Sequence, residues 1–449
     1  MAKSKIDMTS GPIMRLIVIF AIPIIFGNIL QQLYSTVDTL IIGNYCGATS
    51  IAAVGTSSQP IEVFMCIFMG IGAGVSILVS MYTGAQNMED LGKVVKTSVS
   101  FTYLCAIPLA ILGWIVTPLI LGFMQVPADT ISLATAYIRI VFLGLLGNMG
   151  YNMNAGILRG LGDSTASFIF LLVSCISNII LDILFIAFFH MDVVGAALAT
   201  IIAMYMSWIA SIVYILKKYN YIGFTILPKV LDRKTLMDII KLGLPLGLNN
   251  SIYTVGHILM QSLINTQGSA FMAGASVAGK IMGISSVAIS SFSASMATFA
   301  GQNFGAKNYE RLYKGGRIVP LYSALTTIVL GIIMFAFSGS LVGLFTNDEE
   351  AIKYALLCVK IQVPFQWCYC VLNTILNLSN GIGNVKYPTV LNLLMLWAVR
   401  IPAAYLIAFF IDGHYVTAGV SISFVFGMIA SLLFYRSKSW KEIRKLSTT

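Results

Sequence analysis

The stretch Gly84–Leu91, GAQNMEDL, recurs 221 residues later at Gly305–Leu312 as GAKNYERL. The same offset, with a slip of one residue near the start of each half, matches further pairs: Pro23 with Pro245, Asn28 with Asn250, Asn152 with Asn373, and the turn Gly160–Asp163 with Gly381–Asn384. A repeat of this extent indicates architecture before any other signal. The chain is therefore predicted to consist of two homologous halves.

The composition is that of a membrane protein. Of the 449 residues, 58% are hydrophobic and 10% are charged, and the mean hydropathy is +0.88, whereas soluble domains carry about 25% charged residues. Apolar runs of about 20 residues are typical of membrane helices. Twelve such runs are predicted: 14–42, 52–83, 95–121, 130–157, 165–189, 194–216, 236–265, 270–300, 316–338, 351–378, 388–411 and 415–435.

The predicted fold is an all-α integral membrane protein of twelve transmembrane helices in two six-helix lobes. We expect an N-lobe at 1–216, a cytoplasmic linker at 217–234 and a C-lobe at 235–449. Because each half contains an even number of spans, both lobes must have the same orientation. A pseudo-two-fold axis along the membrane normal and a cavity between the lobes are expected, as in transporters built from parallel repeats.

The distribution of basic residues predicts the orientation in the membrane. If the N-terminus is cytoplasmic, 22 of the 27 Lys and Arg residues lie on that side, including those of the linker and of the C-terminal tail. This asymmetry is the signature of cytoplasmic loops. We therefore expect a multi-pass protein of the cytoplasmic membrane with both termini inside the cell and no cleaved signal peptide. The net charge of +10 is then explained by the basic cytoplasmic loops, so it does not indicate a nucleic-acid partner.

Three acidic residues lie well inside predicted spans: Asp38, Glu62 and Asp182. A charge at membrane depth costs at least about 2.5–3.5 kcal/mol, so such residues usually face a cavity and have a function. At about 1.5 Å per residue, Asp38, Asp182 and Thr200 all lie about 8–10 Å below the outer boundary. Asn178 lies one helical turn from Asp182 on the same face.

This set of side chains suits a small cation. Two carboxylates, an amide and a hydroxyl can coordinate Na⁺, and two crowded carboxylates can equally share a proton. The matching positions of the other half hold Met260, Val399 and Ala403. If the acids served only the folding of the scaffold, the homologous half would be expected to carry acids at the same positions. The acids are therefore predicted to be functional. Glu62 and His257 are candidates for a second proton-carrying or substrate-binding group.

Polar side chains at helical spacing predict a substrate cavity. Span one and span seven each carry a polar stripe on an apolar helix, a pattern typical of a helix that faces a bundle interior. The predicted lining residues are Gln31, Ser35, Asn152, Asn250, Tyr253, Gln261 and Lys280. Together with the 21 methionines, which can repack around varied ligands, this surface suits amphipathic, often cationic, compounds.

Taken together, these features resemble those of the multidrug and toxic compound extrusion (MATE) transporters, over essentially the whole length of the chain. The resemblance rests on these stretches: Pro23–Asp38, Leu158–Asp163, Asn178-x-x-x-Asp182 and Gly195–Thr200. The pattern is similar to the DinF-type branch. That similarity implies a cation site at Asp38, Asn178, Asp182 and Thr200 and a hinge at Pro23. Glu62 departs from the family pattern, and the C-lobe acids of the other well-known branch are missing.

The predicted function is a multidrug efflux antiporter, driven by H⁺ or Na⁺, that works by alternating access. No cofactor beyond the coupling ion, no enzymatic activity and a monomeric state are expected. The main alternative is a flippase for a lipid-linked saccharide or another amphiphile. It predicts a strongly basic central cavity, whereas Lys280 and Arg400 are among very few interior bases. A channel or a proton-translocating subunit is a further alternative.

Overall fold

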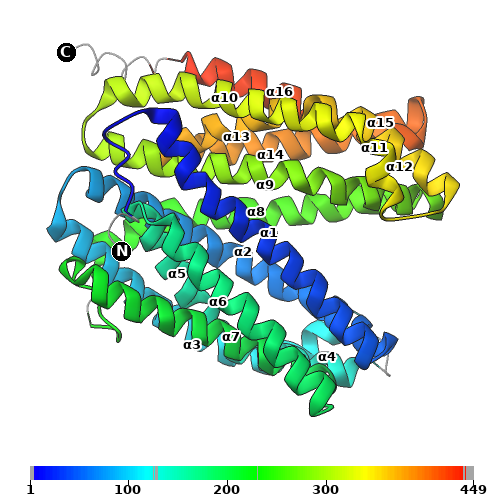
Figure 1. The fold of residues 1–449 in the computed structure, drawn as a ribbon, viewed down its shortest axis with the longest axis horizontal. Coiled ribbons are helices and arrows are strands. Elements are labelled where there is room, and N and C mark those ends of the chain that lie inside the picture. Colours follow the sequence, from blue (N-terminus) through cyan, green and yellow to red (C-terminus); the bar gives the residue numbers. More distant parts are fainter. Residues whose placement is uncertain (1–4, 125, 127–129, 230, 438–439, 441–449) are drawn as a thin grey trace. The chain divides into compact units, whose positions relative to one another are not determined.

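The structure is a computed structural model that describes residues 5–124, 126, 130–229, 231–437 and 440. Within these residues all regular secondary structure is helical (Figure 1). The α-helices are α1 (Ile13–Tyr45), α2 (Ala48–Gly84), α3 (Met88–Phe123), α4 (Ile131–Leu143), α5 (Leu145–Leu161), α6 (Ser164–Asp182), α7 (Asp192–Lys218), α8 (Arg233–Asn265), α9 (Ser269–Gly305), α10 (Tyr309–Ala336), α11 (Ser338–Gly343), α12 (Glu349–Gln362), α13 (Gln366–Gly381), α14 (Lys386–Leu393), α15 (Ile401–Phe410) and α16 (Ala418–Tyr435). Two π-helices, η1 (Ile183–Phe188) and η4 (Leu394–Arg400), continue α6 and α14, and short 3₁₀ turns are η2 (Asn220–Ile222), η3 (Val363–Phe365) and η5 (Gly413–Tyr415).

Ten helices of the described chain are long and apolar enough to cross a membrane. The pair α4 and α5, bent by 46° at Gly144, makes an eleventh span if it is counted as one. The all-helical membrane fold is therefore confirmed. The predicted span at 236–265 is the helix α8, but it does not pass the same test of apolar composition. Its first turns are charged and Asn249, Asn250 and His257 make its second half polar.

The chain divides into two compact units. The first unit contains residues 23–248 with the first six residues, and the second contains residues 7–22 and 249–449. These limits differ from those of the predicted lobes, because residues 7–22 go with the second half, while the linker 217–234 and residues 235–248 go with the first. The helices α1 and α8 therefore each contribute to both units.

Close contact between glycines explains why the beginning of α8 belongs to the first unit. A Cβ atom on Gly70 of α2 would lie 2.1 Å from the backbone nitrogen of Gly247, and one on Gly74 would lie 2.7 Å from Cα of Gly243. Two Gly-x-x-x-Gly stretches thus let the helix backbones touch, as small residues do in membrane helix pairs. The linker also packs on this unit, since Tyr103 donates a hydrogen bond to the carbonyl of Ile226 at 3.0 Å.

Hydrogen bonds to Met8 explain why the N-terminal segment belongs to the second unit. The Met8 N–H donates to Gln302 Oε1 at 3.0 Å, and the Met8 carbonyl accepts from Asn303 Nδ2 at 3.0 Å and from Arg311 Nε at 3.1 Å. The Met8 side chain is fully buried. The sequence boundary at residue 217 missed these segments because it was read from composition, which carries no information about tertiary hydrogen bonds.

The repeated stretch that identified the two halves forms the same turn in both. Gln86 and Lys307 adopt left-handed backbone angles, with φ of 55° and 56°. The following residues, Asn87 and Asn308, cap α3 and α10 by accepting hydrogen bonds from the third N–H beyond. Asparagine is a preferred N-cap because its oxygen satisfies an amide that has no helical partner.

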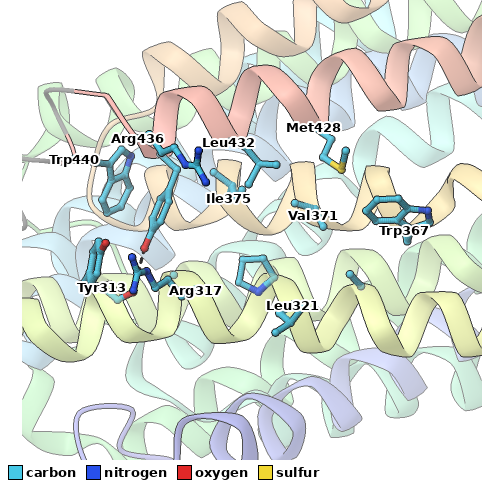
Figure 2. Close-up of a pocket in the computed structure, with 14 residues that line it drawn as sticks. Tyr313, Arg317, Leu321, Trp367, Val371, Ile375, Met428, Leu432, Arg436 and Trp440 are labelled. Carbon is cyan, nitrogen blue, oxygen red and sulfur yellow. Dashed lines mark hydrogen bonds between the residues drawn. The ribbon is translucent and has the colours of Figure 1, made fainter.

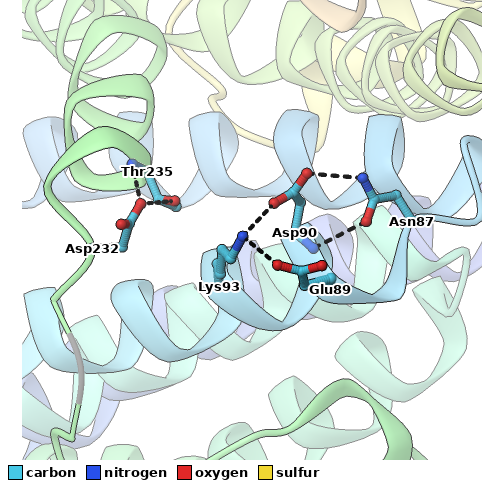
Figure 3. A network of polar contacts seen from close by, with 6 residues as sticks. All are labelled: Asn87, Glu89, Asp90, Lys93, Asp232 and Thr235. Atoms are coloured by element: carbon cyan, nitrogen blue, oxygen red, sulfur yellow. Dashed lines mark hydrogen bonds and ion pairs between the residues drawn. The ribbon is translucent and has the colours of Figure 1, made fainter.

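The start of α3 and the start of α8 are both secured by short polar networks (Figure 3). Lys93 forms ion pairs with Glu89 at 2.7 Å and with Asp90 at 3.0 Å, which lie four and three residues before it on α3. Asp232 accepts hydrogen bonds from the backbone and the hydroxyl of Thr235 at 2.8 and 2.6 Å. These exposed pairs define where the helices begin and contribute little to stability individually.

A buried carboxylate fixes the start of α6, the helix that ends at Asp182. Asp163 is fully buried, and its Oδ1 caps α6 at the Ala166 N–H. Its Oδ2 accepts hydrogen bonds from Tyr214, Lys218 and Tyr219 at 2.7–3.0 Å. Burial opposes the charged form, but the hydrogen bonds outweigh it and hold the pKa of Asp163 below its ordinary 3.8. The network therefore ties α6 to the end of α7.

The lowered pKa of Asp163 predicts an acid-sensitive contribution to stability. A group whose folded pKa is depressed stabilises the fold above its unfolded pKa and loses that effect as pH falls through the folded pKa. We expect Asp163→Asn to lower the free energy of unfolding by about 1–2 kcal/mol at pH 7, because the ion pair is lost. The difference in melting temperature from wild type should shrink only below about pH 4. An unchanged difference down to pH 3, or none at pH 7, would contradict this role.

Candidate functional site

The structure places two acids of the first unit next to each other. Asp38 lies in the second half of α1, and Asp182 is the last residue of α6, where the helix changes to the π-helix η1. Single π-helical segments occur frequently at functional sites. Asp182 is fully buried and Asp38 is partly buried. The two carboxyl groups interact directly, and the Oδ1 atom of each has no hydrogen-bond partner among the described residues.

Asn178 and Thr200 complete the predicted set. With its amide oriented to pair donors with acceptors, Asn178 donates to Asp182 Oδ2 at 2.8 Å and accepts from the Thr200 N–H at 3.2 Å. The opposite orientation would place the amide oxygen against the carboxylate, so we assign the first. The Thr200 hydroxyl donates to the Ala196 carbonyl at 3.0 Å, and its oxygen can still accept a hydrogen bond or contact a cation.

Two tyrosines belong to the same site and were not predicted. Tyr34 lies one turn before Asp38 on α1, lines the same small cavity as Thr200 and is close to both carboxylates. Tyr137 of α4 is buried and also lies close to Asp38 and Asp182. The spacing of four residues from Asp38 could have identified Tyr34. No sequence signal identifies Tyr137, because its position depends on how α4 packs.

A small polar cavity of about 100 Å³ adjoins the acids within the first unit. Tyr34, Asn178 and Thr200 line it, so it opens directly onto the site. Its remaining lining residues are Gln31, Asn148, Tyr151, Asn152, Leu171, Ser174, Cys175, Ala203, Met204 and Ser207. Within it, Asn152 Nδ2 donates to Asn148 Oδ1 at 2.9 Å. Two predicted substrate residues, Gln31 and Asn152, are therefore brought next to the acids.

The other predicted residues of the first unit do not join this cluster. Ser35 and Glu62 are exposed, and Glu62 is not among the groups that interact with Asp38 or Asp182. Pro23 is the residue at which α1 passes from the second unit into the first. This position agrees with the expected place of a hinge but leaves its motion as a prediction.

The predicted residues of the second unit fall into two groups. Asn250, Gln261 and Lys280 are exposed; Gln261 donates to Asn265 at 2.8 Å, and Lys280 lies 5.5 Å from the centre of the Phe345 ring. Tyr253 and His257 lie together, with ring centres 5.1 Å apart. The second unit has no acids at the positions that match Asp38 and Asp182, because Met260 and Ala403 stand there.

A larger groove of about 790 Å³ runs along α10, α13 and α16 of the second unit. Figure 2 shows apolar residues such as Leu321, Val371 and Leu432 along its length, with Arg317 and Arg436 together at one end. None of the predicted site residues lines this groove, and its lining contains no acid. It therefore has no part in a cation site.

The side chains around the acid pair supply oxygen ligands. Among the described residues, no group of three or more His, Cys, Asp or Glu side chains could hold a metal ion. Two carboxylates with neutral amide, hydroxyl and phenol groups are instead suited to Na⁺ or to a shared proton.

Comparison with known proteins agrees with this geometry. The MatE family model matches residues 23–184 and again residues 245–406, one match in each half. The chain is 27% identical over 439 residues to the probable multidrug resistance protein YpnP of Bacillus subtilis, covering 98% of both chains. It is 25% identical to the probable multidrug resistance protein NorM of Thermotoga maritima, covering 94% of this chain and 92% of that one.

Solved structures show the same fold. The crystal structure of a MATE protein in the bent conformation has a TM-score of 0.90 to this chain at 23% identity, covering 98% of both chains. Because the family model matches most of the chain in two consecutive copies, the predicted resemblance is confirmed. The chain belongs to the MATE family, whose proteins are membrane transporters and not enzymes.

Proposed function

We propose that this protein is a cation-coupled antiporter that exports amphipathic, often cationic, compounds through the cytoplasmic membrane. Both termini are cytoplasmic and the working unit is a monomer in this proposal. The observation that carries it is the acid pair of the partly buried Asp38 and the fully buried Asp182, present in only one half of a duplicated scaffold. The relatives described as probable multidrug resistance proteins support the substrate class.

Energetics supports a functional role for the pair. Two carboxylates in a membrane-embedded, partly dry site repel each other unless a cation or a proton joins them. The orphaned Oδ1 atoms of Asp38 and Asp182 are the acceptors that such an ion would use. Asn178 orients Asp182 through a hydrogen bond of 2.8 Å, and the Thr200 hydroxyl offers a further oxygen.

Coupling requires that the ion and the exported compound favour different conformations. A ligand shifts an equilibrium only by the difference in its affinity for the two states. Cation binding draws Asp38 of α1 toward Asp182 of α6 and so changes the polar cavity that Gln31, Tyr34 and Asn152 line. Pro23, where α1 crosses between units, lacks a backbone donor and is the expected bending point.

Export driven by separate ion gradients tests the proposal. Purified protein in liposomes loaded with a fluorescent lipophilic cation is expected to export the dye when either a pH gradient or a Na⁺ gradient is imposed. The gradient that drives export identifies the coupling ion. Export at the same rate without any gradient would contradict cation coupling.

The two acids are expected to act as one unit. Asp182→Asn should abolish gradient-driven export as fully as Asp38→Asn, because either change removes one of the two carboxylates that together bind the coupling ion. The double variant should be no worse than either single variant, since residues of one interacting pair are not additive. Initial rates of dye export measure this. Additive losses in the double variant would show that the acids work independently.

A further inference from the structure

Among its described residues, the second unit contains one strongly buried basic side chain. Arg400 is the last residue of the π-helix η4 and is 2% exposed. Its Nε donates to the Ser423 hydroxyl at 3.0 Å, and its Nη1 donates to the Tyr253 hydroxyl at 2.6 Å. Its Nη2 is buried and has no hydrogen-bond partner among the described residues.

No carboxylate of the described second unit neutralises this guanidinium. The acids of that unit all lie at helix starts or in connections: Asp7, Glu310, Asp348, Glu349, Glu350 and Asp412. Arg400 accordingly makes no ion pair with a described residue. Arginine remains charged when buried, and a buried charge without a counter-charge is strongly destabilising. The fold alone gives no reason to keep such a residue.

Aromatic rings compensate the charge only in part. The guanidinium carbon lies 5.3 Å from the centres of both the Tyr253 and the Phe424 ring. Tyr369 stacks on Phe424, with ring centres 4.4 Å apart. Cation–π contacts stabilise a positive charge but do not cancel it. Tyr253 and Tyr369 are partly exposed, so the guanidinium lies directly beneath an accessible surface.

The internal repeat places this cluster at the site that corresponds to the polar cavity of the first unit. Tyr369 and Asn373 match Asn148 and Asn152 at the offset of 221 residues, and Tyr253 matches Gln31 with one residue more. Those three residues of the first unit line the cavity beside the acids. The duplicated scaffold therefore carries a negative group beside this position in one half and a positive group in the other.

We propose that Arg400 binds the carboxylate of an anionic or zwitterionic compound in the second unit. One N–H of Nη2 and the second N–H of Nη1 remain available on the same edge of the planar guanidinium. Two parallel N–H groups of this kind can donate to the two oxygens of a carboxylate. Ser423 and Tyr253 hold the fork in place, and the rings of Tyr253, Tyr369 and Phe424 bind the apolar part of the compound. Binding at Arg400 does not depend on the proposed export function. Only the further step, that the bound compound is transported, rests on that function.

Equilibrium binding of two matched probes tests this site. Detergent-purified protein is titrated with 1-naphthoate and with the neutral 1-naphthamide, which differ only in the charged group. In Arg400→Met the affinity for 1-naphthoate should fall at least about 30-fold, while that for 1-naphthamide changes by less than about twofold. Arg400→Lys should recover part of the loss, because it keeps the charge but not the fork. Lys353→Met, which removes an exposed base of the same unit, should bind both probes as wild type does.

Several results would overturn the inference. One is unchanged 1-naphthoate binding in folded Arg400→Met. The melting temperature of this variant should equal or exceed that of wild type, because an apolar side chain replaces a buried charge. Another is displacement of 1-naphthoate by an equal concentration of chloride, which would make this a halide site. Asp38→Asn separates this inference from the proposed function. It should bind 1-naphthoate normally while gradient-driven export is lost.

Discussion

Asp38→Asn is expected to reduce gradient-driven dye export to the level of protein-free liposomes. The substitution keeps the size of the side chain and removes its charge, so the site loses one of the two carboxylates that together bind the coupling ion. Binding of the dye to purified protein should remain close to that of wild type, because Asp38 is not among the residues that line the adjoining cavity. The initial rate of export and the equilibrium affinity, measured on the same preparation, check both parts.

Glu89→Gln is the matched control for this prediction. It removes an acid of the same unit from the exposed start of α3, where the side chain is 80% exposed and pairs only with its neighbour Lys93. Export by this variant should equal that of wild type. Full export by Asp38→Asn would remove the acid pair from the transport mechanism.

Gly70→Ala is expected to have the largest effect on stability. The added Cβ would meet the Gly247 nitrogen at 2.1 Å, and the neighbour is backbone that cannot rotate away. Overpacking of this kind costs about 1–3 kcal/mol and more where backbones must separate. Because this contact holds the first half of α8 to α2, we expect a lower melting temperature and a lower yield of folded protein.

The control for this prediction is the same substitution elsewhere in α2. Outside its own turn of helix, a Cβ built on Gly55 would meet no described atom within 4 Å. Gly55→Ala should leave the melting temperature unchanged or raise it slightly, since alanine is favoured over glycine inside helices by about 0.5–1 kcal/mol. Equal melting temperatures for the two variants would show that the glycine contact does not hold α8 in place.

The proposed cation site could be assembled from the sequence because helix geometry restricts it strongly. Counting residues from the ends of spans put Asp38, Asp182 and Thr200 at one depth, and the four-residue spacing put Asn178 beside Asp182. The repeat lacks acids at the matching positions of the other half, which favoured a functional role for Asp38 and Asp182 over a purely structural one. The structure brings these four side chains together, although their function remains a proposal.

Features that depend on packing between distant segments were missed. Tyr137 lies close to the acids on α4, which is bent away from α5 at Gly144. Neither Tyr137 nor Gly144 stands in a sequence pattern that predicts this bend. The environment of Arg400 is contributed by Tyr253 of α8 and Ser423 of α16, which lie 147 and 23 residues away along the chain. Residues 7–22 group with the second unit through hydrogen bonds to Met8, and residues 235–248 group with the first through glycine contacts, neither of which composition can reveal.

Release of the coupling ion on drug binding tests the central claim most directly. A lipophilic cation such as tetraphenylphosphonium is added to detergent-purified protein in weakly buffered solution, and the released H⁺ and Na⁺ are measured with ion-selective electrodes. Wild-type protein should release H⁺ or Na⁺ in proportion to the drug bound, and Asp38→Asn and Asp182→Asn should bind drug and release neither ion. Equal release from wild type and both variants, or drug binding by wild type without any release, would contradict an ion site built from these two carboxylates.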